Sequence, residues 1–391
     1  MTASALTRPG QRERLTVKVG ELDWRLAGLI AAVACFGGLI LYAIAPHLGS
    51  GPPTGSMEPW AARQMIRFLL LFGLMMGLAL IDLRVWYALA YPLYGLALLM
   101  LLAVMVVGVT RLGAKRWLGH GQLAFQPSEI MKIALVMALG RFYHGSTAKQ
   151  ARWSVRLLIP AAMIAVPTLL VLKQPDLGTA ILLAATGGTV MIMAGLDWRA
   201  IAAGGVGLCV AAPLFVMFAA HGYQKQRLTT FLNPAADPSG SGYHIMQSEI
   251  ALGSGGFLGK GFLLGSQAQL NYLPEKQTDF IFASVAEEFG FVGCFALLIA
   301  YGLIVAMCLR IASLSYSHFG RLSAAGVTAT FALYVLINGA MVMGLAPVVG
   351  VPMPLLSYGG TVMVTVMCGF GLVMAVRVHR YLELPKGRGF M

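Results

Sequence analysis

Charged residues are scarce in this chain. Of its 391 residues only 11% are Asp, Glu, Lys or Arg, whereas 58% are hydrophobic. A soluble domain carries about 25% charged residues. Acidic residues are rarer than basic residues, with 15 Asp and Glu against 28 Lys and Arg. This composition excludes an ordinary soluble enzyme and indicates that most of the chain faces lipid or other apolar helices.

Cysteine is also scarce, and its distribution argues against a metal site. The five cysteines all lie in apolar segments and lack the paired spacing of zinc or iron–sulfur ligands. Buried free thiols are the simpler interpretation. The basic residues are spread over many connections instead of forming one patch, which argues against nucleic-acid binding.

Apolar segments long enough to cross a bilayer, about 17 to 25 residues, recur along nearly the whole chain. Ten are recognised: 24–46, 61–81, 86–109, 127–142, 156–172, 177–195, 200–219, 280–309, 322–346 and 356–376. The sequence therefore predicts an all-α polytopic membrane protein with about ten transmembrane helices. We expect a single membrane domain over 24–377, with tails at 1–23 and 378–391.

The distribution of Lys and Arg predicts the orientation of these segments. If the N-terminus is cytoplasmic, 17 of the 28 basic residues lie inside, 7 lie outside and 4 lie in the long loop 220–279. Both termini are then cytoplasmic, and the long loop, between the seventh and eighth helices, is periplasmic. We expect short amphipathic helices in it, for instance around 244–252. Its Gly-rich stretch 252–262 does not fit a phosphate-binding loop and indicates close backbone approach.

Two charged residues open the fourth segment. The motif Gln126-Pro-Ser-Glu-Ile-Met-Lys132 places Glu129 and Lys132 three positions apart, on one helix face. A Glu near a helix N-terminus complements the dipole, so a local role for the pair is one interpretation. Burying a lysine about one turn inside an apolar helix needs a stronger reason, and we favour a functional role.

The motif Lys173-Gln-Pro-Asp-Leu-Gly-Thr179 joins the fifth and sixth segments on the same side. Asp176 is placed to cap the sixth helix, and Pro175 is an ordinary turn residue. Alone, this motif is structural. Its position on the side of Glu129 and Lys132 makes Asp176 a candidate site residue.

Asp279 is the strongest candidate, because it lies where the long polar loop enters the eighth apolar segment. Keeping an ionisable group at a membrane boundary is costly and points to function. The alternative is that Asp279 only caps the helix. Glu287 and Glu288 lie about two turns further in. We expect them to be structural, with cationic or hydrogen-bonding partners from neighbouring helices.

The connection 347–361 contains three prolines and several glycines. This composition predicts a rigid, non-helical re-entry between the last two helices. Such backbone at membrane depth must be covered by protein or line a cavity. We expect it to form a wall of the outer site.

Four motifs together resemble the SEDS family (shape, elongation, division and sporulation), in the family's order and over nearly the whole chain. They are Phe125-Gln-Pro-Ser-Glu129 with Lys132, Lys173-Gln-Pro-Asp-Leu-Gly-Thr179, Leu273-Pro-Glu-Lys-Gln-Thr-Asp-Phe-Ile-Phe282 with Ala286-Glu-Glu288, and Pro354-Leu-Leu-Ser-Tyr-Gly-Gly360. Val348-Val-Gly-Val-Pro352 and Asn271-Tyr-Leu-Pro-Glu-Lys-Gln-Thr278 are similar to the rod-shape branch of the family rather than the division branch.

The resemblance implies a peptidoglycan glycosyltransferase. It would polymerise lipid II, a disaccharide-pentapeptide on undecaprenyl pyrophosphate, at the outer face of the inner membrane. Asp279 matches the family's essential acidic residue, and Glu129, Lys132 and Asp176 match positions in its central cavity.

The partner that the resemblance implies is a class B penicillin-binding protein, a transpeptidase bound through membrane helices, which we expect to dock on the outer surface of the eighth and ninth segments. Small residues in the ninth segment are expected to permit close helix approach. They are Ala324, Ala325, Gly326 and Ala329.

The chemistry fits an inverting displacement with Asp279 as the base. The pKa of an ordinary Asp, about 3.9, makes it a weak base at neutral pH, and desolvation would raise that pKa. The leaving pyrophosphate needs cations, for which Lys132, Lys115 and Arg116 are candidates. Lys173 and Ser357 are further cavity candidates. A divalent cation, Mg²⁺ or Mn²⁺, is possible, but the sequence contains no recognisable ligand set.

Two other functions fit a polytopic protein of this kind. A lipid II flippase would carry its charges at mid-membrane depth and often shows inverted repeats or paired broken helices, which we do not find in the sequence. A scaffold would only recruit the transpeptidase. The outer position of Asp279 favours the enzyme.

Overall fold

The computed structural model describes residues 15–45, 55–111, 114–119, 124–145, 155–214, 218, 222–234, 237, 240–273 and 275–385. Within these ranges the chain is mostly helical. One short antiparallel hairpin, formed by β1 (Val109–Arg111) and β2 (Ala114–Trp117), follows the fourth helix.

Each of the ten predicted apolar segments corresponds to one helix. These are α2 (Trp24–Ala43), α3 (Ala61–Ala79), α4 (Leu83–Val107), α5 (Pro127–His144), α6 (Leu158–Lys173), α7 (Leu177–Met193), α8 (Trp198–Leu214), α12 (Ile281–Ser313), α13 (His318–Val342) and α14 (Gly360–Val378). Among the described residues, seven helices are long and apolar enough to cross a membrane: α2, α3, α4, α6 with the preceding short η2 (Val155–Leu157), α12, α13 and α14. A mostly helical membrane protein is confirmed, the short β1–β2 hairpin was not predicted, and seven helices rather than ten meet these criteria.

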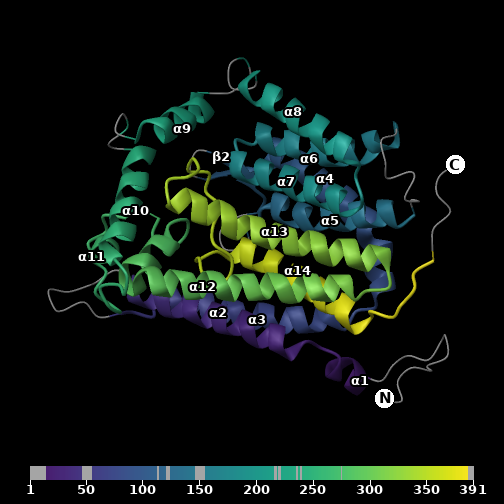
Figure 1. Ribbon diagram of the computed structural model, residues 1–391, viewed down its shortest axis with the longest axis horizontal. Helices are drawn as coiled ribbons and strands as arrows, with labels where there is room; N and C mark the ends of the chain where they lie inside the picture. The colour runs from purple at the N-terminus through teal and green to yellow at the C-terminus, as the bar shows by residue number, and fades with distance from the viewer. Residues whose placement is uncertain are drawn as a thin grey trace.

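Helix α13 lies at the centre of the bundle, where it packs against α5, α7, α12 and α14 (Figure 1). Most residues of α13 and α14 are buried, whereas α3, α4 and α6 expose apolar side chains on their outer faces. An apolar face turned outward is what a lipid-facing helix requires. Glu129 and Lys132 of α5, which packs against α13, are accordingly buried within protein.

The three helices of the long loop gather at one end of the bundle, opposite α1 (Leu15–Gly20) (Figure 1). They are α9 (Gly222–Leu232), α10 (Ser241–Gly255) and α11 (Ser266–Gln269). Helix α10 confirms the helix predicted around 244–252. The Ser248 hydroxyl, on α10, donates to Val342 O at the end of α13 at 2.7 Å. The loop is therefore anchored to the bundle core.

The opposite end joins the two ends of the described chain. The Lys18 ammonium donates to Leu80 O and contacts the His379 ring at 3.0 Å. Glu21 and Arg380 form an ion pair of 3.2 Å. Part of the predicted tail 1–23 is thus the docked helix α1. Residues 1–14 and 386–391 of the two predicted tails lie outside the described residues.

Candidate active site

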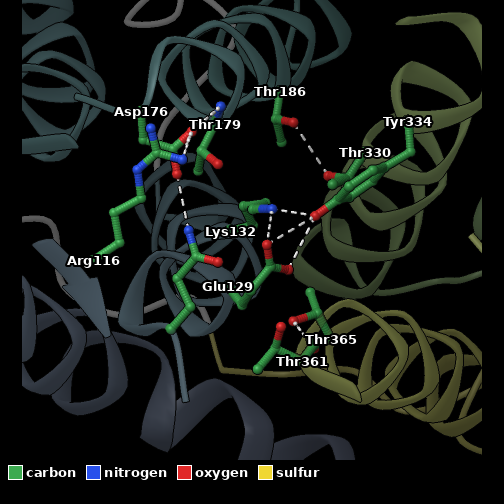
Figure 2. A network of polar contacts seen from close by, with 11 residues as sticks. Arg116, Glu129, Lys132, Asp176, Thr179, Thr186, Thr330, Tyr334, Thr361 and Thr365 are labelled. Atoms are coloured by element: carbon green, nitrogen blue, oxygen red, sulfur yellow. Dashed lines mark hydrogen bonds and ion pairs between the residues drawn. The ribbon is translucent and has the colours of Figure 1, made fainter. Parts of the chain in front are cut away.

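Glu129 and Lys132 form a buried cluster at the start of α5 together with Tyr334 of α13 (Figure 2). Pro127 begins α5 and Glu129 lies in its first turn, as the dipole favours. The Lys132 Nζ atom lies 2.6 Å from Glu129 Oε1 and also contacts the Tyr334 hydroxyl. That hydroxyl donates to Glu129 Oε2 at 3.0 Å. The predicted pair is therefore confirmed as a contact, with a third member from another helix.

A small cavity lies on the other side of Lys132, between α5, α13 and α14. Its volume is about 20 Å³, and Thr330, Phe331 and Phe370 are among its lining residues. This is room for about one water molecule. The Lys132 cluster therefore does not itself hold a sugar ring or a polyprenyl chain at this cavity.

Asp176 forms a second cluster at the start of α7 (Figure 2). Its Oδ1 atom accepts from Thr179 N at 3.2 Å, so the predicted helix cap is confirmed. The same carboxylate accepts from the Gln126 amide at 2.9 Å and lies 3.8 Å from the Arg116 guanidinium. Asp176 thus combines the capping role with a polar contact to the segment that precedes Glu129.

The backbone around Asp279 is held from two sides. From α13, the Asn338 side-chain amide donates to Asp279 O at 2.8 Å and to Val351 O at 2.7 Å. From the connection 347–361, here called the Pro-rich connection, the Ser357 hydroxyl donates to Thr278 O at 2.5 Å. The next backbone amide of that connection donates to the carbonyl of residue 277 at 2.7 Å. These bonds are accepted by main-chain oxygens only, so the Asp279 carboxylate is not needed to hold this part of the chain.

The Asp279 carboxylate does not cap α12. Phe280 occupies the N-cap position, and no side chain accepts a hydrogen bond from the first turn of that helix. Asp279 is partly buried, and its carboxylate forms no hydrogen bond or ion pair with any other described residue. A Cβ atom built on Gly350 would lie 3.5 Å from Asp279 Oδ2. The capping alternative is therefore wrong, and the carboxylate faces a glycine of the Pro-rich connection.

Burial shifts the titration of Asp279, which lies in the loop that precedes α12. Burial and, to a smaller extent, the nearby Glu275 carboxylate raise the pKa of Asp279 to about 6. The Arg227 guanidinium acts in the opposite direction and lowers this pKa. A carboxyl group with a pKa near 6 is a better proton acceptor than an ordinary Asp and is still mostly ionised at neutral pH.

The Pro-rich connection separates the Asp279 carboxylate from the Asp176 cluster. A Cβ atom on Gly178, two residues after Asp176, would lie only 2.5 Å from Val349 O. Gly350, the next residue, is the one that faces Asp279. The predicted non-helical backbone is thus confirmed, and its residues 349 and 350 lie beside Gly178 and the Asp279 carboxylate.

Helix α13 connects the Glu129 cluster to Asp279. Tyr334 and Asn338 are four residues apart and therefore lie on the same face, one turn apart. Tyr334 bonds Glu129, and Asn338 bonds the backbone of Asp279. One helix thus sets the relative position of two parts of the site.

The other predicted site residues have different surroundings. The Lys115 ammonium is tied to the end of α4, where it donates to Met105 O and Val106 O. Lys173 ends α6, is exposed, and forms no ion pair within the described part of the chain. Ser357 is buried and holds backbone, since its hydroxyl also accepts from the amide of residue 353 at 2.8 Å. In this structure Ser357 thus holds the backbone on both sides of its own hydroxyl, including that of Thr278 next to Asp279.

The expected partners of Glu287 come from the long loop. Its carboxylate is fully buried and lies 2.6 Å from the Lys260 ammonium, so the predicted cationic partner is confirmed. Its hydrogen-bond donors Ser266 and Gln267 belong to the short helix α11, whereas Lys260 lies in the Gly-rich stretch and not in a neighbouring helix. Glu288 is also buried, but it forms no ion pair with any described residue, so a cationic partner for it is not found.

Sequence reasoning missed four polar residues that hold the site. Tyr334 and Asn338 are polar positions one turn apart in an apolar helix, a signal that was available. Gln64 of α3 donates to Ser357 O at 2.7 Å, and the Arg67 guanidinium lies 4.9 Å from the centre of the Tyr358 ring. A charge one turn inside an apolar helix, as at Arg67, is a similar signal.

A preformed cation site is not present among the residues that the structure describes. They contain no group of three or more His, Cys, Asp or Glu side chains that could hold a metal ion. Mg²⁺ is often held by one or two carboxylates together with substrate phosphates. The described residues alone therefore do not form a site that would hold a metal.

Comparison with known proteins places these residues in a family. The model of a cell cycle protein family, that of FtsW, RodA and SpoVE, matches residues 25–382. The chain is 41% identical to the peptidoglycan glycosyltransferase MrdB of Escherichia coli K12, covering 92% of this chain and 94% of that protein. It is 34% identical to a probable peptidoglycan glycosyltransferase FtsW of Trichlorobacter lovleyi, covering 93% and 95%.

Solved structures are similar over the same length. A chain from a peptidoglycan synthase complex that coordinates polymerization and crosslinking gives a TM-score of 0.77 at 32% identity, covering 93% of this chain and 99% of that one. The rod shape determining protein RodA of Thermus thermophilus gives a TM-score of 0.68 at 30% identity, covering 93% and 98%. The similarity therefore extends over both the bundle and the long loop.

Proposed function

Because the chain belongs to the cell cycle protein family of FtsW, RodA and SpoVE, the SEDS family, we propose that it polymerises lipid II with Asp279 as general base. The chain is a peptidoglycan glycosyltransferase of the inner membrane, the activity named for the relatives that it matches along 92% of its length. Its greater identity to MrdB than to FtsW, 41% against 34%, supports a role in elongation and cell shape.

One observation carries the assignment of Asp279 as the base. Its carboxylate is partly buried and unpaired within the described residues, while its backbone is held by Asn338 and its neighbour Thr278 by Ser357. The Glu129 and Asp176 carboxylates both have cationic partners, Lys132 at 2.6 Å and Arg116 at 3.8 Å, and are therefore already engaged within the protein. Asp279 is the acidic residue of the site that remains available to accept a proton.

The proposed reaction is a single displacement at the anomeric carbon of the donor sugar. The 4-hydroxyl oxygen of the acceptor sugar forms a bond to that carbon, and the bond to the pyrophosphate oxygen breaks. The hydroxyl proton moves to Asp279, and the electron pair leaves with undecaprenyl pyrophosphate. An α-linked donor then gives a β-1,4 product, so one base is enough.

The leaving pyrophosphate develops negative charge that the site must stabilise. Lys132 and Arg116 remain the candidates from α5 and β2, each beside a carboxylate in the structure. Lys173 ends α6, and Lys115 of β2 is bonded to the end of α4; both are proposed to attract the anionic substrate. A divalent cation would have to be shared between Asp279 and the pyrophosphate, and chelation by EDTA during the assay described next tests this requirement.

Purified protein in detergent with lipid II is expected to produce glycan polymer, with a rate that depends on Asp279 ionisation. The base form increases as pH rises through the Asp279 pKa of about 6, so the rate should increase about tenfold for each pH unit below that value and level off above it. Gel separation of labelled glycan at several pH values measures this. A flippase or a scaffold would give no polymer at any pH, and a rate unchanged between about pH 5 and 7 would contradict Asp279 as the base.

For the topology, we propose that all ten helices cross the membrane and that residues 220–279 are periplasmic. The excess of Lys and Arg in the inside segments supports this orientation. A single cysteine at Leu270, which is 61% exposed, should react with an impermeant maleimide in intact spheroplasts lacking the native thiols. A cysteine at the exposed Trp198, at the start of α8, should react only after the membrane is disrupted. The reverse labelling pattern would show that the proposed topology is inverted, and the active site would then lie on the opposite side of the membrane from the proposed substrate.

The proposed partner is a class B penicillin-binding protein that docks through its membrane helix. The structural similarity to a chain of a peptidoglycan synthase complex supports such a partner. The prediction that small residues of α13 form this interface is wrong. Ala324 is buried, and a Cβ atom on Gly326 would lie 2.7 Å from Val136 and Val190. They are used for packing inside the bundle.

The exposed face of α12, the eighth predicted segment, remains the proposed surface for the transpeptidase. Phe295 and Leu298 are 55% and 42% exposed on this helix. Replacing both with Ala is expected to reduce co-purification of the co-expressed transpeptidase several-fold, because apolar packing area is lost. Leu169→Ala on α6, at a position 58% exposed, is the matched control and should have no effect. Equal recovery of the transpeptidase with wild type and both variants would place the interface elsewhere.

A further inference from the structure

Helix α12 is interrupted near its start. Gly290 has φ 63° and ψ −161°, which is not helical, so residues 281–289 form a short first segment and the rest of α12 a second one. A break in a helix frees backbone N–H and C=O groups. In a membrane protein these groups need partners within the protein.

The Gly-rich part of the long loop supplies these partners. Lys260 N donates to Glu287 O at 2.9 Å, and Gly261 N donates to Glu288 O at 3.0 Å. On the other side of the break, Phe291 N donates to the carbonyl of residue 256 at 3.0 Å, and the next amide donates to that of residue 257 at 3.2 Å. Residues 256–261, here called the inserted loop, therefore replace the hydrogen bonds that α12 lacks.

Glycine is required on both sides of this contact. A Cβ atom would lie 1.9 Å from Ala286 O at Gly255, and 2.3 Å from the nitrogen of Gly259 at Gly290. Both distances are shorter than any tolerated contact. At Gly253, two residues earlier in α10, a Cβ atom would meet nothing within 4 Å. The Gly-rich stretch is thus explained by close backbone approach, as the sequence predicted.

An ion pair joins the inserted loop to the first segment of α12. The fully buried Glu287 carboxylate lies 2.6 Å from the Lys260 ammonium and accepts from the Ser266 hydroxyl at 3.0 Å. It also accepts from Gln267 N at 3.0 Å. A buried carboxylate with this many donors resists displacement. The inserted loop and the first segment of α12 are therefore held together as one rigid unit.

We propose that the inserted loop and the Lys260–Glu287 ion pair position Asp279 for the glycosyl transfer. This inference rests on the proposed function. The first segment begins two residues after Asp279, and the break at Gly290 separates it from the rest of α12. The position of Asp279 relative to the bundle is then set by the inserted loop on one side and by Asn338 and Ser357 on the other. Lys260 and Glu287 are positioning residues that do not touch the substrate.

Loss of the loop contact has two expected effects on Asp279. The carboxylate becomes misplaced, and a displacement of about 1 Å can reduce turnover about 100-fold. It also becomes more exposed, so that its pKa falls from about 6 toward the ordinary value. Two charged groups, Glu275 and Arg227, act on the pKa of Asp279, and substitutions in the inserted loop do not change them. The titratable ring of His244 stacks on Phe280, the residue after Asp279, at 5.9 Å between ring centres.

Two matched pairs of variants test the proposal in the full-length protein. Gly255→Ala is expected to reduce turnover about 10- to 100-fold and to move the acid limb of the pH profile to lower pH, whereas Gly253→Ala should behave as wild type. Lys260→Met should show the same two changes. Lys260→Arg, which keeps the charge, should retain most of the wild-type rate. Detergent monodispersity and melting temperature identify any variant that fails to fold. If Gly255→Ala fails to fold, the Lys260 pair decides.

Hydrogen exchange gives a readout that does not depend on activity. Peptides that include Phe291 and Val292, whose amides donate to the inserted loop, should exchange faster in Gly255→Ala and Lys260→Met than in their controls. If the wild-type protein makes no polymer, the proposed function fails, and the exchange comparison still shows whether the loop holds α12. Folded Gly255→Ala and Lys260→Met proteins with wild-type rates and an unchanged acid limb would overturn the positioning role.

Discussion

Asp279→Asn is expected to abolish polymerisation of lipid II while the protein stays folded. The substitution keeps the size of the side chain and removes its ability to accept a proton at neutral pH. General-base catalysis contributes about 100- to 10,000-fold, so at most about one per cent of the wild-type rate should remain. The bonds that hold this part of the chain use the main-chain oxygens of residues 277–279, which the substitution does not change.

The measurement is the yield of glycan polymer from purified protein at saturating lipid II. Binding of lipid II and detergent monodispersity should be nearly unchanged. Asp197→Asn, at the turn before α8, is the matched control and should polymerise normally, since among the described residues the Asp197 carboxylate accepts a hydrogen bond from Arg199 N near the surface and has no other partner. Substantial polymer from Asp279→Asn would remove the central assignment and leave Glu129 and Asp176 as the next candidates for the base.

Lys132→Met is expected to give the second largest effect, a loss of both activity and stability. The change leaves the Glu129 carboxylate buried with only the Tyr334 hydroxyl as a partner. Removing one member of a buried ion pair costs about 3–5 kcal/mol. Glu129→Gln leaves Lys132 unpaired in the same way. Both variants should have a lower melting temperature and almost no polymerase activity.

The double variant Glu129→Gln, Lys132→Met separates stability from catalysis. Without either charge no unpaired ion is buried, so the melting temperature should recover relative to Lys132→Met, whereas activity should not. Arg63→Met, which breaks the exposed pair with Glu58, is the control, since exposed pairs contribute about 0–1 kcal/mol. If both single variants melt and polymerise as wild type, the buried pair is only a feature of the helix end.

Local sequence patterns determined the helices and the nearest contacts of the site. Runs of apolar residues predicted the ten helical segments because each backbone group in lipid must be bonded within its own helix. The spacing of three between Glu129 and Lys132 predicted their contact, and the position of Asp176 before α7 predicted its cap. These interactions join residues that are close in the chain, so helix geometry alone specifies them.

Contacts between distant segments were decided only by the tertiary structure. The partners of Glu129 and Asp279 on α13, Tyr334 and Asn338, lie 205 and 59 residues away in the sequence. The break in α12 has the same origin, because its freed backbone groups are stable only where the Gly-rich loop reaches them. The capping interpretation of Asp279 failed for a related reason: Asn338 and Ser357 hold the backbone so that Phe280, and not Asp279, begins the helix. Such choices depend on which helices become neighbours, and no local pattern of residues contains that information.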